Sequence, residues 1–491
     1  MQEKRRACVI GGGFGGLTTA ALLARSGWKV TLVEKNAELG GRARAWHEKG
    51  FVFDMGPSWY LMPEVFEQFF AYFGEKRENF YALNRLDPYY RVFWDDGSVD
   101  ITPDIEKTRA TFATFEPNGD EKLTRYMAGA KYKYDIAMKE FLYRDYKNVF
   151  QFLNKRILLE GTKMNIFSGL DSFVRRYFTS NRAAQILEYA MVFLGSSPKN
   201  APALYSIMSH VDLDLGVFFP QGGMTSVVSG LSRLAESLGV EIRTSSPVTR
   251  LAVTGGRVDA VETENDTIPC DLAVVNADYA FAESRLLPPE YRTYSEKYWN
   301  KRTWAPSMFI LYLGLSKKLA KTVHHNLYFS TPWDDHFDTI FKNPAWPENP
   351  SYYVSCASYD DSTVAPEGHE NVFFLVPVAP GLEDTDEIRE KYAEKILDHF
   401  ERLTGETIRD SIIIRRIYSH RDFAEDYNAF KGSALGLAHT LNQTAVFRPG
   451  HRSKRVGNLY YSGQYTHPGV GVPMTFIASQ VVSNLIDKDQ R

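Results

Sequence analysis

The chain has 491 residues, about three times the length of a typical domain, so it can bury one large core or several. Its 57 Lys and Arg residues against 60 Asp and Glu residues leave it without the basic excess that a nucleic-acid-binding protein needs. The three cysteines are far apart, which argues against a disulfide framework or a C-x-x-C metal site. We therefore expect a large chain with no metal and no nucleic-acid partner.

The first sixty residues predict a β-α-β unit. A short strand at 7–10 leads into a glycine-rich turn, an apolar helix that ends near Gly27 and a second strand at 29–34. No apolar run approaches the ~20 residues that span a bilayer, and the N-terminus leads directly into the first strand. We expect a parallel sheet in a chain that neither spans a membrane nor is exported by an ordinary signal.

The turn at 11–16 carries the spacing G-x-G-x-x-G between a strand and a helix. Gly11 permits a tight turn, Gly13 allows the backbone to approach a pyrophosphate, and Gly16 allows the helix to pack closely on the strand. Glu34 ends the second strand, where a carboxylate can accept hydrogen bonds from an adenosine ribose. The glycines alone fit an empty βα turn equally well, but strand, helix and acid together favour a dinucleotide, which would lie at the helix N-terminus.

Elements of the same kind recur later in the chain. The pattern predicts a helix at 227–238 followed by strands at 240–244, 248–253 and 273–276, and then a strand at 459–462 and a helix at 472–486. Two inserts richer in aromatic residues separate these pieces. We expect a discontinuous dinucleotide-binding domain of residues 1–85, 215–295 and 415–491, and a substrate-binding, membrane-associating domain of residues 86–214 and 296–414.

Two motifs follow Glu34, namely LGGRAR at 39–44 and GFVFDMGPSW at 50–59. They resemble the amine oxidase and phytoene desaturase superfamily of FAD proteins, in which a G-G-R loop lies along the pyrophosphate. Gly41 would allow close approach, and Arg42 offers a planar, permanently charged set of donors to phosphate oxygens. A solvated basic loop is the alternative for Arg42 and, with more weight, for Arg44.

The resemblance is more specific towards the C-terminus, where it is to bacterial phytoene desaturases. It rests on PQGGM at 220–224, DLAVVNAD at 271–278, GSA at 432–434, NLY at 458–460 and THPGVGVP at 466–473. Residues 478–480 depart from it, reading Ala-Ser-Gln where relatives often carry Gly-Ser-Ala. The resemblance implies an α/β fold: a Rossmann-like FAD-binding domain of the glutathione-reductase or amine-oxidase type, interleaved with an α+β substrate domain that has a helical insert.

The resemblance also implies site residues. Those expected to contact FAD are Gly11, Gly13, Phe14, Gly15, Gly16, Glu34, Lys35, Gly41, Arg42, Gly56, Pro57, Ser58, Val248, Gly463, Gly469, Gly471 and Val472. Those expected to line a substrate tunnel near the flavin are Trp59, Tyr60, Phe218, Phe219, Tyr465 and Phe476, although a place in the ordinary core would explain each of them equally well.

No Ser-His-Asp, Cys-His or H-E-x-x-H arrangement is present in the sequence, so a cofactor must carry the reaction. His467 is a weak candidate for acid–base work. Its position between Thr466 and Pro468 favours a role in shaping the flavin loop.

The resemblance implies an FAD-dependent carotenoid desaturase that introduces C=C bonds into a C40 polyene such as phytoene by hydride transfer to flavin. Oxygen or a quinone would then be the electron acceptor. The same motifs fit a carotenoid 3,4-desaturase, a C30 diapocarotenoid desaturase or oxidase, and a carotenoid isomerase. Two hypotheses of other classes are a flavin amine oxidase and a non-enzymatic protein that binds prenyl lipids.

The insert at 139–176 interleaves basic and aromatic residues. By itself this pattern fits a helical domain with a solvated basic face, but a lipophilic substrate would favour a segment that rests on anionic lipid. We therefore expect a cytoplasmic protein that is peripheral on the inner face of the membrane. The aromatic residues of the insert are Tyr143, Tyr146, Phe150, Phe152, Phe167 and Phe173.

Overall fold

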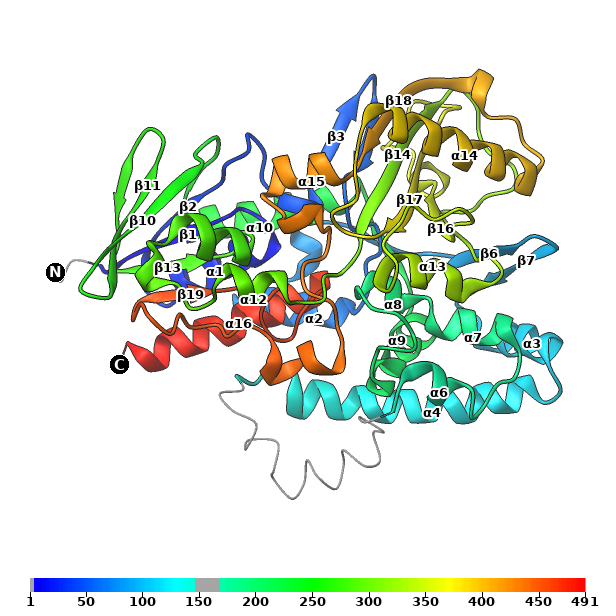
Figure 1. Cartoon of the computed structure of the whole chain (residues 1–491), viewed down its shortest axis with the longest axis horizontal. Coiled ribbons are helices and arrows are strands. Elements are labelled where there is room, and N and C mark those ends of the chain that lie inside the picture. Colours follow the sequence, from blue (N-terminus) through cyan, green and yellow to red (C-terminus); the bar gives the residue numbers. More distant parts are fainter. Residues whose placement is uncertain (1–3, 146–167, 491) are drawn as a thin grey trace.

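A computed structural model describes residues 4–145 and 168–490, which form two lobes (Figure 1). The first lobe is built on a five-stranded sheet in the order β19-β13-β1-β2-β9, in which every neighbouring pair is parallel. Most of its residues are buried, as is usual for a parallel sheet covered on both faces. The strands are β1 (Arg6–Ile10), β2 (Lys29–Val33), β9 (Glu241–Arg243), β13 (Leu272–Val275) and β19 (Leu459–Tyr461).

Three helices pack together beside this sheet, with α1 in contact with both of the others. They are α1 (Phe14–Arg25), α10 (Met224–Ser237) and α16 (Val472–Asp489). Because α1 is enclosed on most sides, its first ten residues are all buried. A three-stranded antiparallel meander, β10 (Val248–Thr254), β11 (Arg257–Thr263) and β12 (Thr267–Pro269), extends the lobe. The elements predicted from sequence in this lobe are confirmed, with ends that differ by at most three residues.

The second lobe is built on a seven-stranded mixed sheet in the order β18-β14-β17-β16-β15-β6-β7. Alternate residues of its strand β14 face opposite sides, so Phe309 and Leu311 pack towards α14 whereas Met308 and Ile310 face the helical insert. The strands are β6 (Tyr90–Trp94), β7 (Gly97–Ile101), β14 (Ser307–Leu315), β15 (His325–Tyr328), β16 (Tyr352–Ser355), β17 (Glu370–Val378) and β18 (Ile412–Tyr418).

The helices of the second lobe lie on either side of the sheet (Figure 1). The long helix α14 (Asp386–Thr404) covers one face, and its sequence has the apolar stripe expected of a helix on a core. The opposite side carries α3 (Ile105–Phe115), α4 (Gly119–Ile136), α6 (Leu170–Val174), α7 (Asn181–Glu188), α8 (Ala190–Phe193) and α9 (Ile207–His210). This architecture confirms the predicted fold class.

Part of the predicted membrane-facing insert lies outside the described residues, including Tyr146, Phe150, Phe152 and Phe167. Within the described part of the insert, Phe173 is buried in the core of the helical side. In the two ranges that the structure describes, no helix is long and apolar enough to cross a membrane.

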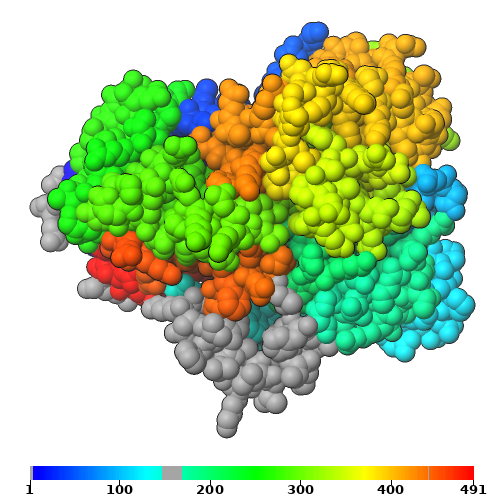
Figure 2. Space-filling view, in the orientation of Figure 1, coloured from blue at the N-terminus to red at the C-terminus, as the bar shows by residue number. Residues whose placement is uncertain are grey.

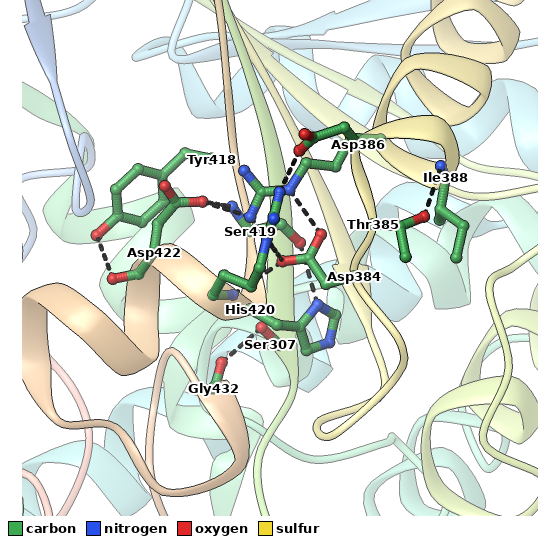
Figure 3. A network of polar contacts seen from close by, with 12 residues as sticks. Ser307, Asp384, Thr385, Asp386, Ile388, Tyr418, Ser419, His420, Asp422 and Gly432 are labelled. Carbon is green, nitrogen blue, oxygen red and sulfur yellow. Dashed lines mark hydrogen bonds and ion pairs between the residues drawn. The ribbon is translucent and has the colours of Figure 1, made fainter.

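Helix α15 (His420–Tyr427) is fastened to the start of α14 by the polar network in Figure 3. Asp384 accepts two hydrogen bonds of 2.6 Å from the guanidinium of Arg389, which also donates to Asp422 at 2.7 Å. Burial alone would raise the pKa of Asp384, but these hydrogen bonds and one from the backbone N–H of Arg421 lower it. Figure 2 shows α15 and the chain after it, in orange, between the two lobes.

The variant D384N should destabilise the protein by about 3 kcal/mol, because it weakens a buried ion pair and leaves part of a buried guanidinium uncompensated. D386N is the matched control, since the Asp386 side chain is 86% exposed and pairs with a half-exposed Arg421. Thermal unfolding of both variants would measure the difference. Equal midpoints for the two variants would contradict the role assigned to Asp384.

Candidate active site

A cavity of about 1190 Å³ lies at the carboxyl ends of β1, β2 and β13 and continues between the two lobes. β1 connects through α1 to β2 on one side and pairs with β13 on the other, so the cavity opens at the topological switch point of the sheet. Sites for a single small ligand typically measure ~300–1,000 Å³. This cavity therefore has room for a dinucleotide and a second molecule.

The glycine-rich turn brings helix α1 against the strand before it. A Cβ atom on Gly16 would lie 1.8 Å from the carbonyl oxygen of Gly11, so only glycine allows this approach. A Cβ on Gly15 would lie 2.4 Å from Oδ1 of Asn276, at the end of β13. The N-terminus of α1 is thereby held at the cavity, where its free N–H groups favour an anion.

Glu34 is held rigidly beside this turn. Its Oε2 accepts a hydrogen bond from the N–H of Gly12 at 2.7 Å, and its Oε1 accepts one from the N–H of Asn36 at 2.9 Å. The side chain is buried and lines the cavity, and each carboxylate oxygen has lone pairs left to accept a hydroxyl. This geometry fits the recognition of a ribose.

Arg42 brings a positive charge to the cavity. Its Nε and Nη2 atoms are buried, and among the described residues they have no hydrogen-bond partner. A Cβ on Gly56 would lie 2.0 Å from the carbonyl oxygen of Arg42, so the motif at 50–59 packs directly against the loop at 39–44. A buried guanidinium with free donors matches an anion that is bound in the cavity. Arg44, in contrast, forms an ion pair with Asp426.

Most residues expected to contact FAD meet at this cavity. Two of them do not line it. Gly16 packs behind the turn against Gly11, and Gly469, whose φ is +124°, packs against the ring of His439. The residues that line the cavity are Gly11, Gly13, Phe14, Gly15, Glu34, Lys35, Gly41, Arg42, Gly56, Pro57, Ser58, Val248, Gly463, Gly471 and Val472.

Two of the six expected tunnel residues, Trp59 and Tyr465, line the cavity. The structure places Tyr60 and Phe476 in the core of the first lobe instead, where each contacts the ring of Phe66. Trp59 and Tyr60 are adjacent in sequence, so a position beside a motif does not decide which side chains line the cavity.

The other two expected tunnel residues also lie away from the cavity wall. Phe219 is buried and packs on the ring of His324 with an edge-to-face geometry. Phe218 lies beside it on the short strand β8 (Phe218–Pro220) and packs against the core of the first lobe. Four of the six aromatic residues chosen because they adjoin a motif thus lie away from the cavity, whereas most of the motif residues line it.

His467 ties the C-terminal glycine loop to the helical insert. Its Nε2 donates to the carbonyl oxygens of Phe141 and Leu142, at 3.1 and 3.2 Å. Burial lowers the pKa of His467 to about 4, so the imidazole is neutral at physiological pH. These contacts support the structural role for His467.

The rest of the wall comes from residues that the sequence did not single out. Apolar side chains of the helical insert and of β14 dominate it, including Phe193, Met208 and Ile310. The acid Asp212 and its partner Tyr189 reach the same wall from a π-helical segment, η6 (Val211–Leu215), and from the end of α7. The hydrophobic pattern of the sequence does not indicate that an acid on such a segment faces a cavity. The π-helical turn itself is a type that is frequent at functional sites.

Comparison with known proteins agrees with this geometry. The family model described as "Flavin containing amine oxidoreductase" matches residues 14–486. The chain is 45% identical to the carotenoid 3,4-desaturase of Haloarcula japonica over 98% of both chains. It is 32% identical to the zeta-carotene-forming phytoene desaturase of Myxococcus xanthus, over 98% of this chain and 93% of that one.

A solved oxidoreductase from Methanosarcina mazei has the same fold, with a TM-score of 0.65 and 15% identity over 98% of this chain and 100% of that one. The site residues fit the flavin that the family implies, since Glu34 can hold the ribose and Arg42 the pyrophosphate. The chain therefore belongs to the flavin-containing amine oxidoreductase family, as an FAD-dependent oxidoreductase of the carotenoid desaturase type.

Proposed function

We propose that the protein desaturates a linear C40 carotenoid at a C3–C4 single bond next to an already conjugated chain. The observation that carries this proposal is the 45% identity, over nearly the whole of both chains, to a carotenoid 3,4-desaturase. The sequence motifs alone predicted phytoene as the substrate, and the 32% identity to a phytoene desaturase keeps that as the second candidate.

The cavity supports a substrate that is long and apolar. Beyond the dinucleotide part, its wall is formed largely by Leu, Met, Ile, Phe and Tyr side chains of the helical insert and the mixed sheet. Such a wall cannot satisfy a strongly polar substrate without a loss of hydration. It can bury a polyene along its length and exclude water from the reacting bond.

Each part of the site has a defined task in this proposal. Bound FAD supplies the hydride acceptor. Glu34 and Arg42 hold its ribose and pyrophosphate, and the apolar wall orients the substrate bond beside the ring. Desaturation also removes a proton from the neighbouring carbon. The positive charge that develops on the substrate is delocalised over its conjugated segment and acidifies that C–H bond, so a weak base is enough to accept the proton.

A substrate of this kind dissolves in membranes rather than in water. We therefore also propose that the protein binds peripherally to the inner membrane surface. Oxygen or a membrane quinone would then reoxidise the flavin.

Purified protein with FAD should convert a conjugated carotenoid that lacks the 3,4 double bond, supplied in liposomes. The expected result is a single red shift of the absorption spectrum, because one double bond extends the chromophore. Stepwise red shifts from phytoene would favour the second candidate, whereas an altered cis peak at unchanged chromophore length would indicate an isomerase. Peroxide release with small amines and no carotenoid conversion would reject both candidates.

The variant R42M should weaken FAD binding at least about tenfold, since it removes charge-assisted hydrogen bonds to the pyrophosphate. R44M is the matched control from the same loop, because its guanidinium already pairs with Asp426. Flavin content after purification and fluorescence titration with FAD would measure the effect. Equal losses in the two variants would contradict the assignment of Arg42.

A further inference from the structure

The proton that desaturation releases must leave a cavity whose wall is largely apolar. A chain of hydrogen-bonding side chains starts at this wall with Ser58 and Tyr353, both of which line the cavity. The Ser58 hydroxyl lies 2.9 Å from that of Tyr353, and the Tyr353 hydroxyl lies 2.6 Å from Nδ1 of His325. Because Ser58 is one of the residues expected to contact FAD, the chain begins on the side of the cavity where the reacting bond would lie.

His325 is an uncharged base at the inner end of this chain. It is fully buried on β15, and its ring stacks on that of Trp59 with the centroids 4.3 Å apart. Burial and the neighbouring His324 lower the pKa of His325 well below its usual value, so the imidazole is neutral. Its Nδ1 can accept the hydroxyl proton of Tyr353, and its Nε2 then carries the hydrogen. That Nε2 is buried and has no hydrogen-bond partner among the described residues.

A second imidazole continues the chain towards solvent. The ring centroids of His324 and His325 are 4.4 Å apart. Nδ1 of His324 lies 2.9 Å from a carboxylate oxygen of Asp360, so Nδ1 carries the hydrogen and Nε2 is left as an acceptor. This Nε2 is also buried without a partner in the two ranges that the structure describes. An unpaired donor on His325 therefore adjoins an unpaired acceptor on His324, and the side chain of Asp360 is 27% exposed.

We propose that Tyr353 passes the proton released by the substrate to His325, and that His324 and Asp360 return it to solvent. One C–H bond of the substrate leaves as a hydride to FAD. The neighbouring C–H bond gives its electron pair to the new C=C bond and its proton to the oxygen of Tyr353, whose own hydroxyl proton moves to Nδ1 of His325. A water molecule or a small rotation of either ring would complete the transfer from His325 to His324.

Asp212 is an alternative acceptor on the same wall. Its Oδ1 is buried and has no partner among the described residues, and its Oδ2 accepts hydrogen bonds from Tyr90 and Tyr189 at 2.7 and 3.0 Å. The described hydrogen bonds of these two hydroxyls lead only to Asp212 and to each other. An acceptor must release its proton before the next turnover, and only the chain that starts at Tyr353 has described contacts that lead towards solvent.

The test measures a single anaerobic turnover of the holoenzyme in H₂O and in D₂O, with the product quantified by chromatography after rapid quenching. The substrate in liposomes is a conjugated carotenoid that lacks the 3,4 double bond, with phytoene in parallel. The wild type should react more slowly in D₂O, because the hydroxyl proton of Tyr353 exchanges with solvent and moves together with the substrate proton.

The variant Y353F keeps the aromatic ring but loses the hydroxyl. It should react about a hundredfold more slowly, the lower end of what a positioned acid–base group contributes, and should lose the solvent isotope effect. H325F keeps a ring beside Trp59 but has no base, so it should give the same two results. D360N should keep the first turnover and slow later ones, because its amide cannot take up the proton.

Tyr352 provides the matched control. It is adjacent to Tyr353 on β16, and its hydroxyl lies 2.8 Å from Nδ1 of His399, but it packs in the core on the α14 side and does not line the cavity. Y352F therefore removes an equivalent hydrogen bond and should leave the rate and the isotope effect unchanged. Flavin content and thermal midpoint would identify any variant that fails to fold, and H325F decides if Y353F does so.

The outcomes separate this inference from the proposed function, on which it rests. Product formation without an isotope effect in the wild type, or a Y353F variant that keeps the isotope effect at any rate, would overturn the relay and leave the desaturase intact. Loss of the isotope effect in D212N but not in Y353F would overturn it in favour of Asp212. Unchanged later turnovers in D360N would overturn the route beyond His325. A wild type that converts neither carotenoid would overturn the proposed function itself.

Discussion

The contact between the first turn of α1 and the end of β1 is the constraint on which the rest of the site depends. Because Gly16 lies against the carbonyl oxygen of Gly11 with no room for a Cβ, the helix can begin directly at the sheet edge. Its N-terminal N–H groups then face the cavity between β2 and β13. Glu34 on one side and Asn276 on the other are brought to the same point by strands that are far apart in the chain.

The dinucleotide part of the site could be predicted from sequence because its geometry is local. A strand, a glycine-rich turn, a helix and a strand-end acid bring together the residues expected to hold the phosphates and the ribose, and the loop with Arg42 follows within ten residues of Glu34. Positions that need a positive φ, or that leave no space for a Cβ, require glycine, so they can be recognised in the sequence. Asn276 could also have been expected, since it ends a predicted parallel strand.

The substrate part could not be predicted in the same way. Its wall is assembled from the helical insert, the mixed sheet and the C-terminal loop, so a side chain's position depends on packing between distant elements. Tyr60 and Trp59 are adjacent in sequence, yet one is in the core and the other lines the cavity. Asp212 stands in a stretch with no distinctive spacing, and only its contacts with Tyr90 and Tyr189 show what surrounds it.

The hydrogen bonds of His467 join the glycine loop to the C-terminal end of the first helical stretch of the insert, at Phe141 and Leu142. That loop also forms part of the cavity through Val470 and Gly471. Under the proposed function, a displacement of the insert that admits a long substrate would therefore also displace the backbone of the glycine loop. Because the His467 imidazole is neutral at physiological pH, this coupling between the insert and the glycine loop does not depend on charge.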